Sequence, residues 1–203
     1  MKYTAALYTD QGSRKESNQD SACLRRAAWG DGEILLAAVC DGMGGLQKGE
    51  LASAEAVRTL CSWFDSNLGL LPELCQGDFS RVRAQGNDLL QEIHRSLLAY
   101  SAGSGIQLGT TFTALLAFEN RYLTANVGDS RIYRRTQEGL VQMTADQSLM
   151  AREIALGRIT EEEARHHPQR NVLLQCLGAG TVMQPDFGEG RLRGDGLYLL
   201  CSD

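Results

Sequence analysis

Aspartates follow several short apolar runs of this sequence, and an aspartate is a side chain that can bind a metal ion or move a proton. Asp41, Asp129 and Asp203 each stand at the end of such a run, and Asp20 closes a polar run just before another short stretch. If the fold brings these positions together, several negative charges meet in a partly desolvated place, which is unfavourable unless cations neutralise them or protons stay bound. The pattern therefore indicates a cluster of carboxylates that needs cations.

The chemistry of these side chains favours hard divalent ions. Carboxylate and carbonyl oxygens are the ligands that Mg²⁺ and Mn²⁺ prefer. Zinc is disfavoured, because the histidines stand in helical or charged segments away from the aspartates, at His94, His166 and His167. We therefore expect Mn²⁺ or Mg²⁺ as the bound ion.

Each aspartate taken alone is also typical of an ordinary turn, and this alternative stays open. Asp41-Gly42 and Asp129-Ser130 are common turn dipeptides. The glycine cluster in Asp41-Gly42-Met43-Gly44-Gly45 argues for more than a turn, because a hairpin needs only one glycine. We infer that the backbone approaches another group closely here, and that a carbonyl oxygen could share an ion with the Asp41 carboxylate.

Two helices and a set of short strands must position these residues. Apolar residues recur every three or four positions from 47 to 67 and from 80 to 100, which predicts two amphipathic helices, each packed on a sheet. Short apolar or alternating segments between turn residues predict antiparallel strands. These segments are residues 21–24, 34–40, 111–118, 122–127, 131–134, 140–143 and 197–201.

Residues 147–177 differ from the strand-rich remainder. They are rich in charge, and Thr160 and Glu163 have the spacing of a capping box at the start of a helix. This segment predicts a helical excursion from the sheet.

Length and charge limit the classes of protein and partner. The chain has 203 residues, 43% of them hydrophobic and 22% charged, which predicts one soluble domain over residues 1–203. The net charge of −5 disfavours nucleic acid and anionic membranes as partners. We see neither a secretion signal nor an apolar run long enough to span a membrane, so we expect a cytoplasmic protein.

The cysteines give a second indication of the compartment. Six cysteines never occur as a CxxC pair, and several lie inside apolar runs, which favours free thiols in a reducing compartment. Three disulfides are the alternative, although a chain of this length has no need of them.

An ordered series of motifs runs nearly end to end and resembles the metal-dependent protein phosphatases of type 2C, the PPM family, in its bacterial branch. Each motif is weak alone, but the order and spacing of all eight are specific. They are Asp10-Gln11-Gly12, Asn18-Gln19-Asp20, Asp41-Gly42-Met43-Gly44-Gly45, Gly109-Thr110-Thr111, Val127-Gly128-Asp129-Ser130-Arg131, Thr144-Ala145-Asp146, His167-Pro168-Gln169-Arg170 and Leu199-Leu200-Cys201-Ser202-Asp203.

The resemblance implies an α+β fold, a β-sandwich of two antiparallel sheets flanked by helices in four αββα layers, with a two-metal site at one end. It implies that Asp41 bridges two Mn²⁺ or Mg²⁺ ions, that the carbonyl of Gly42 binds one of them and Asp203 the other, and that Asp20 holds the water shell. Asp129 resembles a ligand of a third ion.

The resemblance also implies that residues 147–177 form a flap beside the active site. Asn171 stands where it can assist Asp129, and its neighbour Arg170 belongs to the same flap motif, so both are candidates for contact with metal or substrate. The implied activity is hydrolysis of phosphoserine and phosphothreonine in proteins by a monomer, with substrates that a Ser/Thr kinase has phosphorylated. In that chemistry Cys40 and Cys201 are core thiols rather than nucleophiles.

Two positions depart from the family pattern. Lys15, preceded by Arg14, stands where the family usually has an arginine that grips the substrate phosphate. A lysine attracts phosphate as a point charge but lacks the two-pronged guanidinium, so either Lys15 substitutes with a weaker grip or the backbone is shifted by one residue to use Arg14. The alternative is that both are solvated surface cations. Met43 stands where some members carry a histidine.

The sequence ends at Asp203, whereas family members continue through another helix, closing strands and an Asp-Asn pair that supplies a further metal ligand. We therefore expect a C-terminally incomplete domain, part of a longer protein. A catalytically weak or inactive phosphoprotein-binding module of the same fold is the alternative function. A phosphatase acting on small molecules or on one anti-sigma-type regulator is a further alternative.

Overall fold

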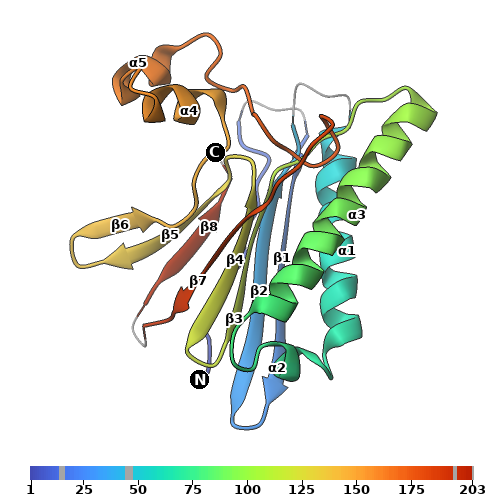
Figure 1. Cartoon of the computed structure of the whole chain (residues 1–203), viewed down its shortest axis with the longest axis vertical. Helices are drawn as coiled ribbons and strands as arrows, with labels where there is room; N and C mark the ends of the chain where they lie inside the picture. The colour runs from blue at the N-terminus through green and yellow to red at the C-terminus, as the bar shows by residue number, and fades with distance from the viewer. Residues whose placement is uncertain (14–16, 44–47, 194–195, 203) are drawn as a thin grey trace.

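The structure is a computed structural model that describes residues 1–13, 17–43, 48–193 and 196–202. Within these residues, two antiparallel sheets face one another, and helices cover the larger sheet (Figure 1). The larger sheet has the strand order β1-β2-β3-β4-β7 and the smaller one β6-β5-β8. The strands are β1 (Asp20–Trp29), β2 (Gly32–Asp41), β3 (Phe112–Phe118), β4 (Arg121–Val127), β5 (Arg131–Thr136), β6 (Gly139–Gln142), β7 (Asp186–Arg191) and β8 (Tyr198–Cys201).

The two predicted helices are present as α1 (Gly49–Asn67) and α3 (Ser80–Ser104), and both lie on the same face of the five-stranded sheet (Figure 1). Helix α3 continues past the expected residue 100 and ends at Gly105, whose φ of 70° is the left-handed conformation that favours glycine at this position. The connection between the helices contains one further short helix, α2 (Leu71–Leu74). No helix among the described residues is long and apolar enough to cross a bilayer.

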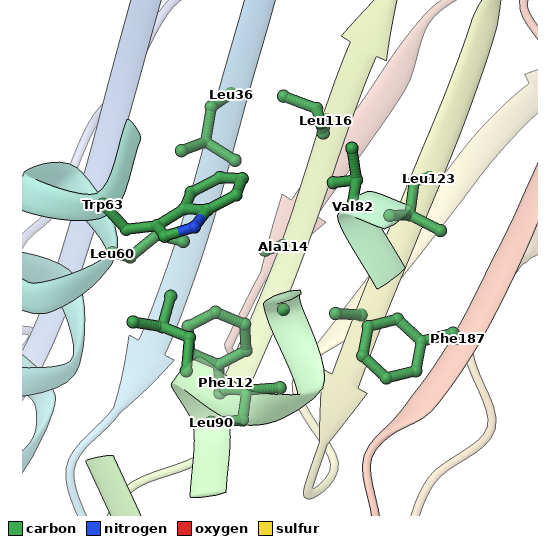
Figure 2. Close-up of a pocket in the computed structure, with 13 residues that line it drawn as sticks. Leu36, Leu60, Trp63, Val82, Leu90, Phe112, Ala114, Leu116, Leu123 and Phe187 are labelled. Atoms are coloured by element: carbon green, nitrogen blue, oxygen red, sulfur yellow. The ribbon is translucent and has the colours of Figure 1, made fainter. Parts of the chain in front are cut away.

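The main core lies between these helices and the five-stranded sheet. Apolar side chains from α1 and α3 meet those of β2, β3 and β4, and a cavity of about 50 Å³ remains between them (Figure 2). Large side chains of this core are almost fully buried, including Phe64, Leu90, Ile93 and Phe112. Burial of such side chains stabilises the folded chain by about 1.5–3 kcal/mol each. This layer fixes the direction of the strands that end at the predicted site.

A smaller core joins the two sheets. Leu115 and Ala117 of β3 and Ile132 of β5 are buried there, and partly buried residues such as Tyr122 and Leu200 pack around them. Strand β3 faces the main core on one side and this smaller core on the other, which explains why its seven residues are buried without alternation. The two sheets are thereby held face to face.

The first hairpin, formed by β1 and β2, sets the positions of two of the predicted acidic residues. Its strands β1 and β2 are aligned over ten residue pairs, from Asp20 opposite Asp41 to Trp29 opposite Gly32. Buried and half-buried residues alternate along β2, which fixes the register because a slip by one residue would expose its core face. The short strand expected at 21–24 is therefore the first part of a longer one that continues to Trp29.

One strand of the larger sheet was not expected from the sequence. β7 pairs with β4 from Asn126 opposite Asp186 to Arg121 opposite Arg191. Its sequence, Asp-Phe-Gly-Glu-Gly-Arg, lacks the apolar alternation that indicates a strand. Gly188 and Gly190 are required because a Cβ atom at either would collide with a β4 side chain, at Thr124 or Tyr122. This strand therefore forms at the edge of the sheet through close packing of its glycines on β4, and its sequence lacks a hydrophobic pattern that could predict it.

The segment 147–177 contains α4 (Leu149–Ala155) and α5 (Glu161–His166), beyond the end of the three-stranded sheet (Figure 1). The predicted capping box at the start of α5 is confirmed: the Thr160 hydroxyl accepts from the Glu163 backbone, and the Glu163 side chain accepts from Thr160. Ser148 caps α4 by accepting from the Ala151 N–H at 3.2 Å. This segment is called the flap below.

Candidate metal centre

The open end of the β1–β2 hairpin places two of the predicted aspartates opposite each other. Asp20 begins β1, Asp41 ends β2, and the two are paired in the register of the sheet. Ser202, which follows β8 in the other sheet, donates a hydrogen bond from its Oγ to Oδ2 of Asp20 at 2.7 Å. Both sheets therefore contribute to the surroundings of the Asp20 carboxylate.

Gly42 lies where no side chain fits. A Cβ atom at this position would stand 2.4 Å from the carbonyl oxygen of Gly49 and 2.5 Å from that of Gln19. The N–H of Gly42 also donates to the Gln19 carbonyl at 3.1 Å. The close approach inferred from the glycine cluster is thus to the chain itself, at the first residue of α1.

Two threonines that directly precede strand β3, Thr110 and Thr111, hold the backbone of Asp41. The Asp41 N–H donates to Oγ1 of Thr111 at 2.8 Å, and the Asp41 carbonyl accepts from the Thr111 N–H and the Thr110 hydroxyl, both at 2.9 Å. Thr110 and Thr111 are buried, at 0% and 2% exposure. A buried hydrogen bond is expensive to lose, so Asp41 has little freedom to shift.

The loop that carries Asp129 is joined to the same network. Gly128 has a φ of 104°, and a Cβ atom there would collide with the Thr111 side chain. The hydroxyls of Thr111 and Ser130 are hydrogen-bonded to one another at 2.7 Å. Thr111 therefore connects the end of β2, where Asp41 lies, to the loop on both sides of Asp129.

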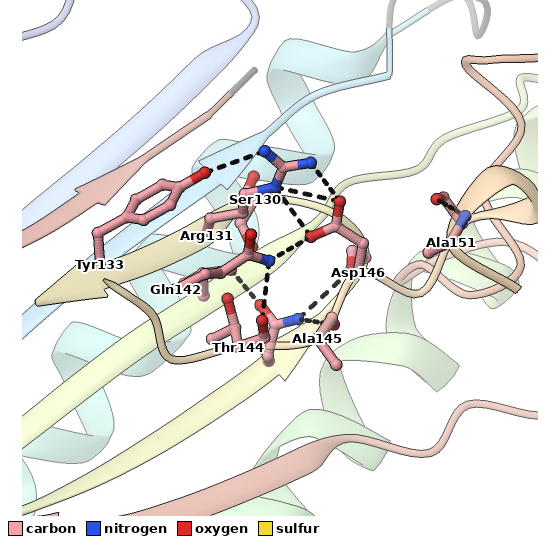
Figure 3. A network of polar contacts seen from close by, with 12 residues as sticks. Ser130, Arg131, Tyr133, Gln142, Thr144, Ala145, Asp146 and Ala151 are labelled. Carbon is pink, nitrogen blue, oxygen red and sulfur yellow. Dashed lines mark hydrogen bonds and ion pairs between the residues drawn. The ribbon is translucent and has the colours of Figure 1, made fainter. Parts of the chain in front are cut away.

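An ion pair holds the end of this loop, where β5 begins at Arg131. The Arg131 guanidinium donates two hydrogen bonds from Nε and one from Nη2 to the Asp146 carboxylate, and Gln142 donates to the same carboxylate (Figure 3). The hydrogen bonds that Arg131 donates to Asp146 raise the pKa of Arg131 above its ordinary value. The Arg131 Nη1 also donates to the Tyr133 hydroxyl at 2.9 Å. Two of the sequence motifs are thus a single structural unit.

The family model described as protein phosphatase 2C matches residues 10–181. The chain belongs to the protein phosphatase 2C family. The protein phosphatase PhpP of Streptococcus pneumoniae is 35% identical over 201 residues, which cover 98% of this chain and 77% of that protein.

Solved structures are similar over nearly the whole chain. A serine/threonine phosphatase of S. agalactiae has a TM-score of 0.81 and 29% identity, covering 96% of this chain and 77% of that one. The catalytic domain of the serine/threonine protein phosphatase PstP, solved with two manganese ions, has a TM-score of 0.72 and 29% identity, covering 96% and 74%. The expected type 2C phosphatase fold, the bacterial branch and the class of phosphoprotein phosphatase are confirmed.

Some of the phosphatase residues predicted from the sequence lie outside the described residues. These are Arg14, Lys15, Gly44, Gly45 and Asp203. Among residues 1–13, 17–43, 48–193 and 196–202, no group of three or more His, Cys, Asp or Glu side chains is arranged to hold a metal ion. The structure brings together Asp20, Asp41 and Gly42, and it links the Asp129 loop to them through Thr111.

The flap residues Arg170 and Asn171 lie in the turn after α5. Both are exposed, and the backbone N–H of Arg170 donates to the His167 carbonyl at 3.1 Å. The chain then returns to the flap base, where the Val172 carbonyl accepts from Leu149 at 2.8 Å. Their roles toward metal or substrate stay predictions.

Cys40 and Cys201 lie near the acidic end of the sheets and lack the features of a nucleophile. Burial raises the pKa of Cys40 well above its ordinary value, and the nearby Cys23 thiol and the Asp20 and Asp41 carboxylates raise it further. Burial also raises the pKa of Cys201. A thiol nucleophile requires the opposite shift. The six cysteines are free thiols.

Sequence reasoning did not single out the hydroxyl groups that organise the site. Thr111, Ser130 and Ser202 each hydrogen-bond a site residue or one another, and each lies inside one of the sequence motifs, where no role was predicted for its hydroxyl. A short polar side chain beside an apolar strand is common in loops, so its type alone carries little signal. Only the pairing of the strands shows which of these hydroxyls face the aspartates.

Proposed function

We propose that this phosphatase hydrolyses phosphoserine and phosphothreonine in proteins at the end of the sheet where Asp20 and Asp41 lie. The observation that carries the proposal is the strand register, which sets Asp20 directly opposite Asp41 on the neighbouring strand. Like charges directly opposite one another on neighbouring strands are destabilising. Divalent cations would remove this repulsion, and the family contains a structure solved with two manganese ions.

The donor set fits Mn²⁺ or Mg²⁺, because every candidate ligand offers oxygen. We assign the carboxylates of Asp41 and Asp203 and the carbonyl of Gly42 to a two-ion site, Asp20 to its water shell and Asp129 to a third ion. The close contact of Gly42 with the start of α1 fixes its backbone next to Asp41, and we assign its carbonyl oxygen to the same ion as that carboxylate. When bound, such ions lower the pKa of a coordinated water to near neutrality and neutralise phosphoryl charge.

The residues of the chain have distinct tasks in this proposal. The threonines at 110 and 111 hold the Asp41 backbone, and Ser202 orients the Asp20 carboxylate through its hydrogen bond. Lys15 or Arg14 attracts the substrate phosphate by charge. Arg170 and Asn171 on the flap contact the protein that carries the phosphate. The substrates are products of a Ser/Thr kinase, and the phosphatase acts as a cytoplasmic monomer.

The test is release of phosphate from a phosphothreonine peptide in the presence of Mn²⁺. We expect activity that a chelator abolishes and that Asp41→Asn lowers at least about a hundredfold, because this substitution removes an anionic ligand of both ions. Thr136→Val, at the far end of β5, is a control that should retain activity. Activity that survives both the chelator and Asp41→Asn would contradict the proposal.

A regulatory module that binds phosphoprotein without hydrolysing it is the second candidate. The lysine at 15 favours it, because a lysine cannot form the paired hydrogen bonds of a guanidinium with phosphate. Calorimetric titration with Mn²⁺ and the phosphothreonine peptide separates the two candidates. Binding without phosphate release would support the module, and turnover would exclude it.

A further inference from the structure

Gln147, the first residue of the flap, is hydrogen-bonded to three separate parts of the chain. Its side-chain Oε1 accepts from the Gly128 N–H at 2.9 Å, and its Nε2 donates to the Gln184 carbonyl at 3.2 Å and to Oδ2 of Asp186 at 3.1 Å. Its backbone N–H donates to the Gly128 carbonyl at 2.9 Å, and its carbonyl accepts from the Leu174 N–H at 2.8 Å. One residue therefore joins a loop, both ends of the flap and the start of β7.

The first of these contacts reaches the loop of Asp129. Gly128 precedes Asp129, and Gln147 pairs with both the N–H and the carbonyl of Gly128. Gly128 is also pressed against Thr111, the residue whose hydroxyl accepts from the Asp41 N–H. A shift of Gln147 would therefore move a loop that is packed against the candidate metal centre.

The remaining contacts close the base of the flap. The flap begins at Gln147, its chain comes back to that residue at Leu174, and Ser148 forms a bridge with Leu173 directly beside them. Gln184 and Asp186 lie where β7 begins, next to β4. Helices α4 and α5 lie beyond this base (Figure 1), so its geometry sets where the whole flap stands.

We propose that Gln147 is a positioning residue, whose side chain locks the base of the flap to the loop of Asp129. Substrate recognition by the flap and the geometry of the acidic centre then depend on one set of hydrogen bonds. The proposal rests on the proposed function, because the flap is assumed to contact the phosphoprotein. The locking itself can be measured without any activity.

Two substitutions separate the contacts of the side chain. Gln147→Leu keeps most of the shape but removes all three side-chain hydrogen bonds. Gln147→Glu keeps the acceptor for the Gly128 N–H, but it loses the donor to Gln184 and sets a second carboxylate against Asp186. Adding Asp186→Asn to Gln147→Glu supplies an amide donor again, so this double variant should recover part of the lost contact.

Hydrogen exchange of the full chain measures the locking directly. We expect exchange at the Gly128 amide to accelerate about tenfold in Gln147→Leu, since its hydrogen bond to Oε1 of Gln147 is lost and such a loss raises local opening by roughly that factor. Gln147→Glu should accelerate it mainly in the segment around 184–186, and the double variant should reverse that change. Gln91→Leu is the matched control, because Gln91 donates to the Met183 carbonyl at 3.0 Å without touching Gly128.

Kinetics with the phosphothreonine peptide tests the link to substrate. We expect Gln147→Leu to raise KM about tenfold and to lower kcat by less than about threefold, whereas Gln91→Leu leaves both unchanged. Unchanged exchange at Gly128 in Gln147→Leu would overturn the proposal, and so would faster exchange with an unchanged KM. A wild-type chain without chelator-sensitive activity would overturn the proposed function instead, while the exchange rates would still decide whether Gln147 locks the flap.

Discussion

A single hydroxyl group at Thr111 links the two strand ends that carry predicted metal ligands. It accepts from the Asp41 N–H and shares a hydrogen bond with the Ser130 hydroxyl, and it is 2% exposed. Water cannot replace these partners at such a buried position. The placement of Asp41 relative to the Asp129 loop is thus determined at the scale of one side chain, which has no need to touch a metal or a substrate.

Thr111→Val tests this role, because valine has nearly the same shape but no hydroxyl. We expect the free energy of unfolding to fall by about 1–3 kcal/mol, the penalty for a buried N–H without a partner, and Mn²⁺ affinity to fall with it. Urea denaturation and calorimetric Mn²⁺ titration measure the two effects.

Thr124→Val is the matched control for that substitution. Thr124 is also buried on a strand, and its hydroxyl donates to the Gly188 carbonyl at 3.2 Å, away from the aspartates. Its substitution should lower stability without changing Mn²⁺ affinity. Equal losses of Mn²⁺ affinity in both variants would mean that Thr111 acts only through general stability.

At the scale of elements, α3 supports the chain that returns from the flap. His94 of α3 is buried, and its Nδ1 accepts from the Gly178 N–H at 3.2 Å. Neighbouring Leu177 pairs with Thr110, whose hydroxyl donates to the Asp41 carbonyl. A contact on the helix is therefore connected through one bridge to the acidic end of the sheet.

This contact predicts a dependence of stability on pH. Burial lowers the pKa of His94 below its ordinary value, so the folded chain favours the neutral ring that can accept from Gly178. The stability that His94 contributes is present above the unfolded pKa of about 6.5 and is lost as the pH falls below it, because the unfolded chain binds the proton more readily.

The measurement is the midpoint of urea denaturation at several pH values. We expect the decrease below neutral pH to be smaller in His94→Gln, since glutamine does not titrate and its carbonyl oxygen can accept from Gly178. His166→Gln, at the exposed end of α5, should leave the decrease as in the wild type. An identical pH profile for His94→Gln and the wild type would exclude His94 as the cause.

For the whole molecule, the sequence predicted the elements whose pattern is hydrophobic. Hydrophobic periodicity predicted the helices α1 and α3 and the antiparallel strands. The positions of Asp41 and Asp129 after apolar runs predicted acidic residues at strand ends. The cap of α5 was predicted as well, because Thr160 and Glu163 interact within one turn. Local interactions of this kind can be predicted from the sequence without knowledge of the fold.

Contacts between segments that are far apart in the sequence could not be predicted from the sequence. β7 has glycines where a strand normally has apolar residues, so only its packing against Tyr122 and Thr124 explains it. The hydrogen bonds of Thr111 and Gln147 join residues that are far apart in sequence, and their types occur equally in ordinary loops. The roles given to Lys15 and Asp203 stay predictions, because both residues lie outside the described parts of the chain.

The central claim is that the paired carboxylates at the end of the β1–β2 hairpin hold divalent cations. Diffraction at the manganese absorption edge from crystals grown with Mn²⁺ tests it most directly. The account predicts anomalous peaks beside the Asp20 and Asp41 carboxylates, and their loss in crystals of Asp41→Asn. Peaks confined to other surfaces, or none at all with Mn²⁺ in excess, would contradict it.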